Sequence, residues 1–189
     1  MGAEDPATAS GRAPFLITPV AMAVVANARE GLHAAERATI LQLRSPGTSA
    51  RELEANASEL VAASPVPVVI SSRCDIALAA GAAGVNLPER DIAVTDARSL
   101  LGQRLIGRSV HSIQTALQAE KDGADFVIFG PVWKSHSHAD AVPAGVEALA
   151  EVARALRIPV LAIGGVTVER IVECHEAGAA GYAAIRLFQ

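Results

Sequence analysis

Eight short apolar runs, separated by longer stretches of helix-favouring composition, constrain the fold of this chain more than any other feature. Short continuous apolar runs are typical of strands that are buried on both faces, as the strands of a parallel sheet are. Intervening stretches such as 49–63 and 112–121 favour helix. The predicted strands are 15–18, 40–43, 66–70, 84–87, 104–107, 126–129, 160–163 and 182–185.

Three of the runs follow a small-residue segment with a glycine inside it: AAGAAG at 79–84, KDGAD at 121–125 and EAGAAG at 176–181. Such a glycine takes the left-handed conformation that ends a helix, and the chain then turns tightly into the next strand. Eight strand–helix repeats predict an α/β fold, a closed (β/α)8 TIM barrel. An open doubly wound sheet is the alternative, but eight repeats within 189 residues favour closure.

The length of the chain fits one domain. We expect residues 1–13 to be a disordered N-terminal arm and residues 14–189 to form a single barrel. The chain stops at Gln189, directly after the eighth run, so the last helix is predicted to be truncated or missing. That would leave an apolar flank exposed, and we therefore expect a homo-oligomer.

Charge and composition exclude several classes of partner. The net charge is −4 and no basic stripe is present, which argues against a nucleic-acid partner. No run approaches the roughly 18 apolar residues of a membrane span, and the start of the chain is not a secretory signal. Cys74 and Cys174 have no metal-ligand spacing, so we expect reduced, buried thiols in a cytoplasmic protein.

In a barrel of this kind ligands bind at the C-terminal ends of the strands, with phosphate at the loops after strands 7 and 8. Gly164 and Gly165 follow the seventh run and are predicted to precede a helix. Two glycines let backbone N–H groups approach an anion closely, and a helix N-terminus adds partial positive charge. The sequence therefore predicts a small-molecule phosphate ligand here, although Gly-Gly pairs are also common in ordinary turns.

The richest polar stretch follows the sixth run and contains Ser135, His136, Ser137 and His138. Hydroxyl groups donate to phosphate oxygens, and a histidine serves as general acid or base near neutral pH. We take the two serines as candidate substrate-binding residues and the two histidines as candidate catalytic residues. A solvated loop without a role is the alternative, and a metal site is disfavoured because no third ligand accompanies the His-x-His pair.

Two further strand ends carry polar side chains that alternation directs to one side. Ser109 and His111 end the fifth strand on a shared face, although Ser109 is equally suited to cap the following helix. Gln42 and Arg44 both point into the barrel mouth if Ile40 does. Buried Gln and Arg side chains need polar partners, which a ligand would supply.

The remaining signal lies in the order and spacing of particular segments from Phe15 onward. They are 42–44 (QLR), Arg73 with Asp75, 81–87 (GAAGVNL), 107–112 (GRSVHS), 123–132 (GADFVIFGPV), Gly145 and 158–166 (IPVLAIGGV). Together these segments resemble the thiamine phosphate synthase/TenI family of barrel proteins. The resemblance implies a thiazole phosphate or thiamine phosphate as ligand, with its phosphate against Gly145, Gly164, Gly165, Ala184 and Ile185.

The resemblance implies two possible activities. The synthase joins a pyrimidine pyrophosphate to the thiazole phosphate with magnesium, and Asp91 would supply a metal carboxylate in that case. The TenI branch tautomerises a thiazole phosphate carboxylate with a histidine and no metal. Pro131 stands where that branch has its histidine, so His111, His136 or His138 would take the role.

Three departures from the synthase pattern decide between these activities. Its Asn-Asp pair after the third strand is 71–72 (SS), a basic residue is replaced by Pro46, and its Thr-Lys-Thr-Lys-like loop is 135–138 (SHSH). Loss of a carboxylate and of cations weakens pyrophosphate binding. We therefore expect a TenI-like isomerase without a cofactor, with a magnesium-dependent transferase and a non-catalytic binder of thiamine-related phosphates as the alternatives.

Overall fold

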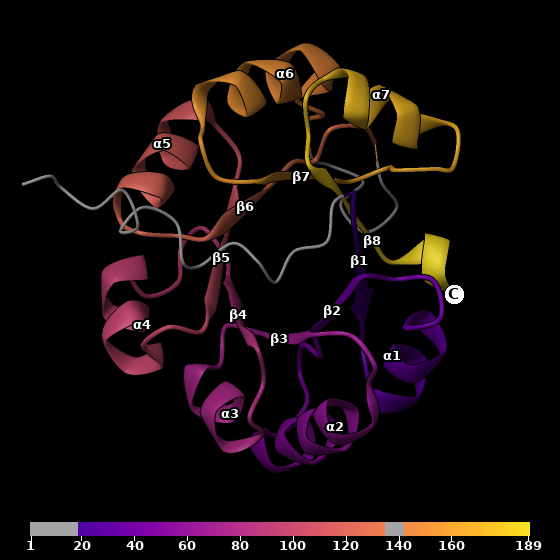
Figure 1. Ribbon diagram of the computed structural model, residues 1–189, viewed down its shortest axis with the longest axis vertical. Helices are drawn as coiled ribbons and strands as arrows, with labels where there is room; N and C mark the ends of the chain where they lie inside the picture. The colour runs from indigo at the N-terminus through magenta and orange to yellow at the C-terminus, as the bar shows by residue number, and fades with distance from the viewer. Residues whose placement is uncertain (1–18, 135–141) are drawn as a thin grey trace, which may run out of the picture.

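The computed structural model describes residues 19–134 and 142–189, and Figure 1 views its ring of strands surrounded by helices. All eight strands are parallel and pair in sequence order, and β8 closes on β1. The strands are β1 Val20–Val25, β2 Ile40–Leu43, β3 Val68–Ser71, β4 Gly84–Leu87, β5 Leu105–Val110, β6 Phe126–Phe129, β7 Val160–Ile163 and β8 Gly181–Ala184. The helices are α1 Ala28–Ala34, α2 Ala50–Ala63, α3 Cys74–Ala79, α4 Val94–Leu101, α5 Ile113–Lys121, α6 Gly145–Ala155 and α7 Arg170–Glu176.

The barrel predicted from the sequence is confirmed, and seven of the predicted runs fall on strands. The first does not, because β1 is Val20–Val25 while the run at 15–18 lies outside the described residues. The β1 sequence VAMAVV alternates alanine with larger residues. Because alanine is the strongest helix former, this composition did not indicate a strand. The expected arm at 1–13 also lies outside the described residues.

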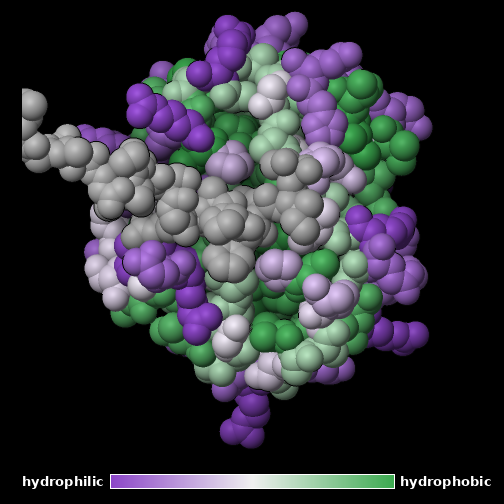
Figure 2. Space-filling model, in the orientation of Figure 1, coloured by the Kyte–Doolittle hydropathy of each residue, from purple (hydrophilic) through white to green (hydrophobic). Residues whose placement is uncertain are grey.

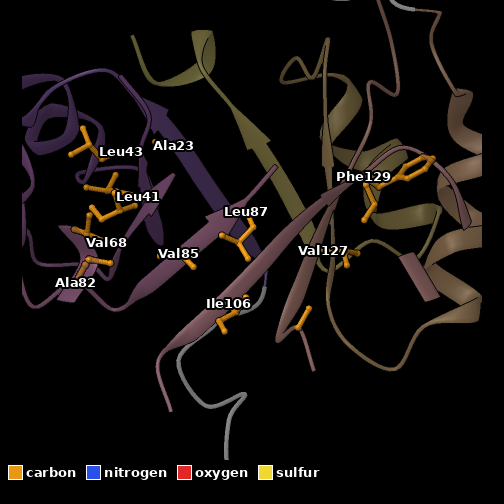
Figure 3. Close-up of a cluster of buried hydrophobic side chains, with 14 of the residues drawn as sticks. Ala23, Leu41, Leu43, Val68, Ala82, Val85, Leu87, Ile106, Val127 and Phe129 are labelled. Atoms are coloured by element: carbon orange, nitrogen blue, oxygen red, sulfur yellow. The ribbon is translucent and has the colours of Figure 1, made fainter. Parts of the chain in front are cut away.

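Two layers of apolar side chains hold the barrel together. The inner layer fills the barrel, and Gly107 makes room for it, because a Cβ on Gly107 would lie 2.2 Å from the Phe126 ring. The outer layer lies between strands and helices, and Figure 3 shows part of it with Leu41, Val85 and Phe129. Each strand contributes alternate residues to the two layers, as the period of two requires.

The predicted glycine turns are confirmed as left-handed helix ends. Gly81, Gly123 and Gly178 follow α3, α5 and α7 with φ of +69°, +91° and +86°. A side chain at such a φ is strained, so glycine fixes where each helix stops and the next strand starts.

After β8 the described residues form a 3-10 turn at Arg186–Phe188. Phe188 is buried against the ring of Tyr182, with the ring centroids 6.3 Å apart. Val168 and Val172, beside and in α7, are 68% and 57% exposed, and Figure 2 shows hydrophobic residues over this helix. None of the helices described here is long and apolar enough to cross a membrane.

Candidate functional site

Gln42 and Asn86 form a polar layer inside the barrel near the C-terminal ends of the strands. Their side chains are 3% and 2% exposed, and they are the buried polar residues of the described chain. The Asn86 Nδ2 group donates to the Ser109 Oγ at 3.0 Å, but Asn86 Oδ1 and Gln42 Oε1 accept from no described group. Leaving a buried acceptor unpaired costs about 1–3 kcal/mol. Two such acceptors in the mouth of a barrel indicate a ligand-binding face.

Of the predicted inward pair, Gln42 is buried inside the barrel and Arg44 is exposed. Strand β2 ends at Leu43, and the Arg44 side chain lies exposed beyond it while its N–H donates to the Val25 carbonyl. Strand alternation applies only as far as the strand continues, so it does not orient Arg44.

Ser72 adds backbone strain to the same face. It is the non-glycine residue of the described chain with positive φ, at +66°, and its N–H donates to the Asn86 carbonyl at 3.0 Å. The left-handed region costs a non-glycine residue about 1–2 kcal/mol, and such residues gather at functional sites. This hydrogen bond continues the pairing of β3 with β4 one residue beyond the end of β3.

Gly164 and Gly165 lie against the loop that follows β6. Their φ values are +92° and +71°; a Cβ on Gly164 would lie 2.6 Å from the Pro131 Cβ, and one on Gly165 would lie 2.7 Å from the Trp133 Cβ. Only glycine fits either position. The expected helix does not follow at once, because α7 begins at Arg170 after a turn, so its N-terminus does not adjoin the glycines.

Three consecutive carbonyls of this loop are hydrogen bonded, and the N–H groups on the same peptides donate to none of the described residues. The Ile163 carbonyl accepts from the Val132 N–H at 2.9 Å, and the Gly164 carbonyl accepts from the Trp133 N–H at 3.0 Å. The Gly165 carbonyl accepts from the Arg170 Nη1 at 2.7 Å. In a trans peptide the carbonyl and the N–H point in opposite directions. The N–H groups of Gly164, Gly165 and Val166 thus face away from those partners and donate to no described residue, and this segment, called the nest below, is a candidate anion site.

The other predicted phosphate residues lie around this nest. Gly145 begins α6, has φ of +86°, and donates its N–H to the Val132 carbonyl at 3.1 Å, so that N–H is already occupied. Ala184 ends β8, and Ile185, which is 36% exposed, directly precedes the 3-10 turn. Because β7 and β8 pair side by side, both lie next to the glycine loop.

His111 lies at the rim and pairs with Glu89 from the loop after β4. The His111 Nδ1 is 2.9 Å from Glu89 Oε2, and the His111 N–H donates to Oε1 at 3.1 Å. Burial alone raises the pKa of Glu89, but hydrogen bonds from Thr115 and His111 outweigh burial and lower it overall. The cap of α5 is Ser112, so Ser109 is left facing Asn86.

The barrel, its nest and its unpaired interior acceptors accompany a family match over nearly the whole chain. The model of the thiamine monophosphate synthase family matches residues 15–188. The chain belongs to that family.

Relatives in the thiamine monophosphate synthase family align along most of their length. The thiamine-phosphate synthase of Anaeromyxobacter dehalogenans is 42% identical over 164 residues, which are 85% of this chain and 73% of the relative. That of Chloroflexus aurantiacus is 36% identical over 152 residues, 78% of this chain and 70% of the relative. The solved structure of a thiamine phosphate pyrophosphorylase from Pyrococcus furiosus superposes with a TM-score of 0.81 at 30% identity, covering 89% of this chain and 86% of that one.

The residues after β3 and β4 do not by themselves make a magnesium site. Asp91 is half-buried, and its Oδ1 accepts from the Ile92 N–H at 2.8 Å. Ser71 and Ser72 bring no second carboxylate. Within 19–134 and 142–189, no three His, Cys, Asp or Glu side chains gather as ligands. Magnesium is usually held by one or two carboxylates together with substrate phosphates, and Asp91 is the described carboxylate that the resemblance assigns to it.

The sequence analysis missed two residues of the mouth. Asn86 is the one polar residue in the run at 84–87, a signal that was visible, since a buried strand has to find a partner for it. Arg170 contacts the nest, but no pattern in the sequence marks it. The predicted Ser135, His136, Ser137 and His138 lie outside the described residues.

Proposed function

We propose that this protein is a thiamine-phosphate synthase, which joins a thiazole phosphate to a pyrimidine pyrophosphate and releases pyrophosphate. The unpartnered N–H groups at Gly164, Gly165 and Val166, in a member of this family, carry the proposal. The names of the relatives favour the synthase over the tautomerase that the sequence departures suggested.

In this proposal the nest holds the phosphate of the thiazole. Three N–H donors in a row suit an oxyanion, and the lack of side chains on the glycines lets the anion come close. The phosphate then fixes one end of the substrate at β7 and β8. The reacting ring extends from there toward the middle of the mouth.

Gln42 and Asn86 bind the second half of the reacting pair. Their unpaired carbonyl oxygens need N–H or O–H donors, so they select a polar ring that carries such groups. The thiazole forms its new bond to the carbon of the pyrimidine compound that bears the pyrophosphate, as the bond from that carbon to pyrophosphate breaks. The attacking atom, that carbon and the leaving oxygen therefore have to be held in line. The protein supplies this positioning, which lowers the activation free energy by roughly several kcal/mol.

Gln42→Met tests this role. Methionine has a similar size and removes the unpaired acceptor, so the variant is expected to melt at a higher temperature while its turnover falls. Asn86→Leu is less informative, because it also breaks the bond to Ser109. A Gln42→Met protein with unchanged turnover would exclude a contact between Gln42 and the substrate.

The direct assay mixes both substrates with the protein, with magnesium or with EDTA, and measures thiamine phosphate by chromatography. Thiamine phosphate that appears with magnesium supports the synthase. Binding of the thiazole phosphate without any product, under both conditions, would overturn it and support a non-catalytic binder.

A tautomerase remains the second candidate, and the His111–Glu89 pair favours it. The carboxylate holds Nδ1, which leaves Nε2 as the nitrogen that exchanges a proton with a substrate. This activity would need no cofactor and would persist in EDTA. Unchanged isomerisation of a thiazole phosphate carboxylate in His111→Ala, His136→Ala and His138→Ala would end this candidate.

We also propose that the protein works in the cytoplasm as a homo-oligomer. Both cysteines are free and buried, as expected for a reducing compartment. Val168 and Val172, beside and in α7, are exposed, and a second copy of the chain would cover them. Light scattering after size exclusion checks this; a monomer at micromolar concentration would contradict it.

A further inference from the structure

Arg170 makes two contacts with the loops of the mouth at once. Its Nη1 donates to the Gly165 carbonyl at 2.7 Å, and its guanidinium carbon lies 5.2 Å from the centre of the Trp133 ring. A planar guanidinium can stack on a ring and donate from its edge, whereas a lysine ammonium cannot do both in this way. Arg170 therefore connects the loop after β7 with the loop after β6.

The contact with the Gly165 carbonyl fixes a donor of the nest. Gly165 has no side chain to limit its backbone, and at φ of +71° the following peptide can rotate. When Arg170 holds the carbonyl, the Val166 N–H on the same trans peptide is directed to the opposite side. Without Arg170, this peptide has no described partner to hold it.

Trp133 limits the loop from the second side. Its N–H donates to the Gly164 carbonyl at 3.0 Å, and its Cβ stands where a side chain at position 165 would be. The ring is half-buried with the guanidinium over it. Gly165 is thus enclosed between Trp133 and Arg170.

We propose that Arg170 is a positioning residue of the Gly164–Val166 nest, which it orients for the phosphate of the substrate by clamping the Gly165 carbonyl against Trp133. The proposal rests on the phosphate-binding role of the nest in the proposed function. The proposal gives Arg170 a role through the peptide, because the described contacts of its guanidinium are with the Gly165 carbonyl and the Trp133 ring.

The test compares a phosphate ester with its parent alcohol. Calorimetry gives the Kd of the thiazole phosphate and of the unphosphorylated thiazole alcohol for the wild type, Arg170→Met and Arg170→Lys. Arg154→Met is the matched control, since it removes the same charge from an exposed site on α6. Trp133 is the single tryptophan of the chain, so its fluorescence reports on the clamp directly.

We expect Arg170→Met to weaken binding of the ester about tenfold and to leave the affinity for the alcohol unchanged, the ratio that the loss of one charge-assisted hydrogen bond predicts. Its Trp133 emission changes and becomes easier to quench with acrylamide. Arg170→Lys keeps the charge but stays weaker than the wild type for the ester. Arg154→Met behaves as the wild type in every measurement.

Three results would overturn the proposal. One is an ester affinity of Arg170→Met within about twofold of the wild type. Another is an Arg170→Lys variant that binds the ester as tightly as the wild type while Arg170→Met binds it more weakly. That result would indicate that the positive charge at position 170, and not the orientation of the Gly165 peptide, contributes to binding. The third is a wild type that binds no ester, which would also remove the proposed function, whereas the first two leave that function intact.

Discussion

Arg98 is predicted to be the side chain whose loss most destabilises the lower end of the barrel, where the strands begin. It lies in α4 and donates to the carbonyls of Gly102 (2.8 Å), Arg104 (2.6 Å) and Gly123 (3.0 Å). It also pairs with Asp125 Oδ2 at 2.6 Å. These contacts join the end of α4 to the starts of β5 and β6.

The size of the effect follows from burial. The side chains of Arg98 and Asp125 are 16% and 7% exposed, so Arg98→Met leaves a buried carboxylate with only the Ile106 N–H as donor, at 2.8 Å. Removing one partner of a buried pair costs about 3–5 kcal/mol. Taking about 3 kcal/mol because that one donor remains, we expect the melting temperature of a chain of this length to fall by about 6–12 °C.

Urea unfolding of the wild type, Arg98→Met and Arg98→Met/Asp125→Asn measures this. The double variant has no buried charge left and is expected to be more stable than the single one. Arg73→Met is the internal control, because the Arg73–Asp75 pair is 41% and 65% exposed and contributes less than about 1 kcal/mol. If Arg98→Met and Arg73→Met unfold at the same urea concentration, the reasoning from burial is wrong.

Three more outcomes follow from the mouth and the thiols. A hydrogen bond from Arg73 lowers the pKa of Asp75 from 3.8 to about 2, so the pair stabilises the fold above about pH 4 and is lost as pH falls toward 2. NMR titration of Arg73→Met is expected to return this pKa to its ordinary range, and an unchanged value would contradict the pairing. Gly165→Ala is expected to abolish binding of the thiazole phosphate in calorimetry, while Gly81→Ala, with a similar φ of +69° but open space around it, keeps it. Burial raises the pKa of Cys174 to about 11, so a thiol reagent near pH 8 should label Cys174 only in unfolded protein, as mass spectrometry would detect.

Most of the fold could be predicted from the sequence because local and global signals agree. Runs such as 126–129 are strands both by composition and by their place between helices, and the glycines at 81, 123 and 178 mark where helices end. The failure at β1 has a physical cause. Alanine packs well inside a crowded barrel but carries little strand signal of its own, so only the closure of β8 onto β1 identifies VAMAVV as a strand.

The candidate site was less predictable, because its groups depend on where each strand stops. Gln42 is in the strand and turns inward, but Arg44, two residues later, is outside it. The Gly-Gly pair marked the nest, whereas the direction of its N–H groups depends on donors to the neighbouring carbonyls that lie 31 residues earlier (Val132 to Ile163, Trp133 to Gly164) and in α7. Such tertiary partners leave no periodic pattern in the sequence.

The two ends of this barrel differ in how completely their polar groups are paired. At the lower end, Asp125 and three backbone carbonyls all find donors on Arg98, although the Arg98 Nε itself is buried without a partner. At the mouth, acceptors on Gln42 and Asn86 and the donors of the nest find no partner among residues 19–134 and 142–189. The buried acceptors at the mouth destabilise the fold, and a ligand with an anionic end and a donor-bearing ring would pair with both kinds of group. The paired polar groups at the lower end thus stabilise the fold, and the unpaired groups at the mouth destabilise it. Because the two sets lie at opposite ends of the barrel, the loops of the mouth can change their chemistry without loss of the fold.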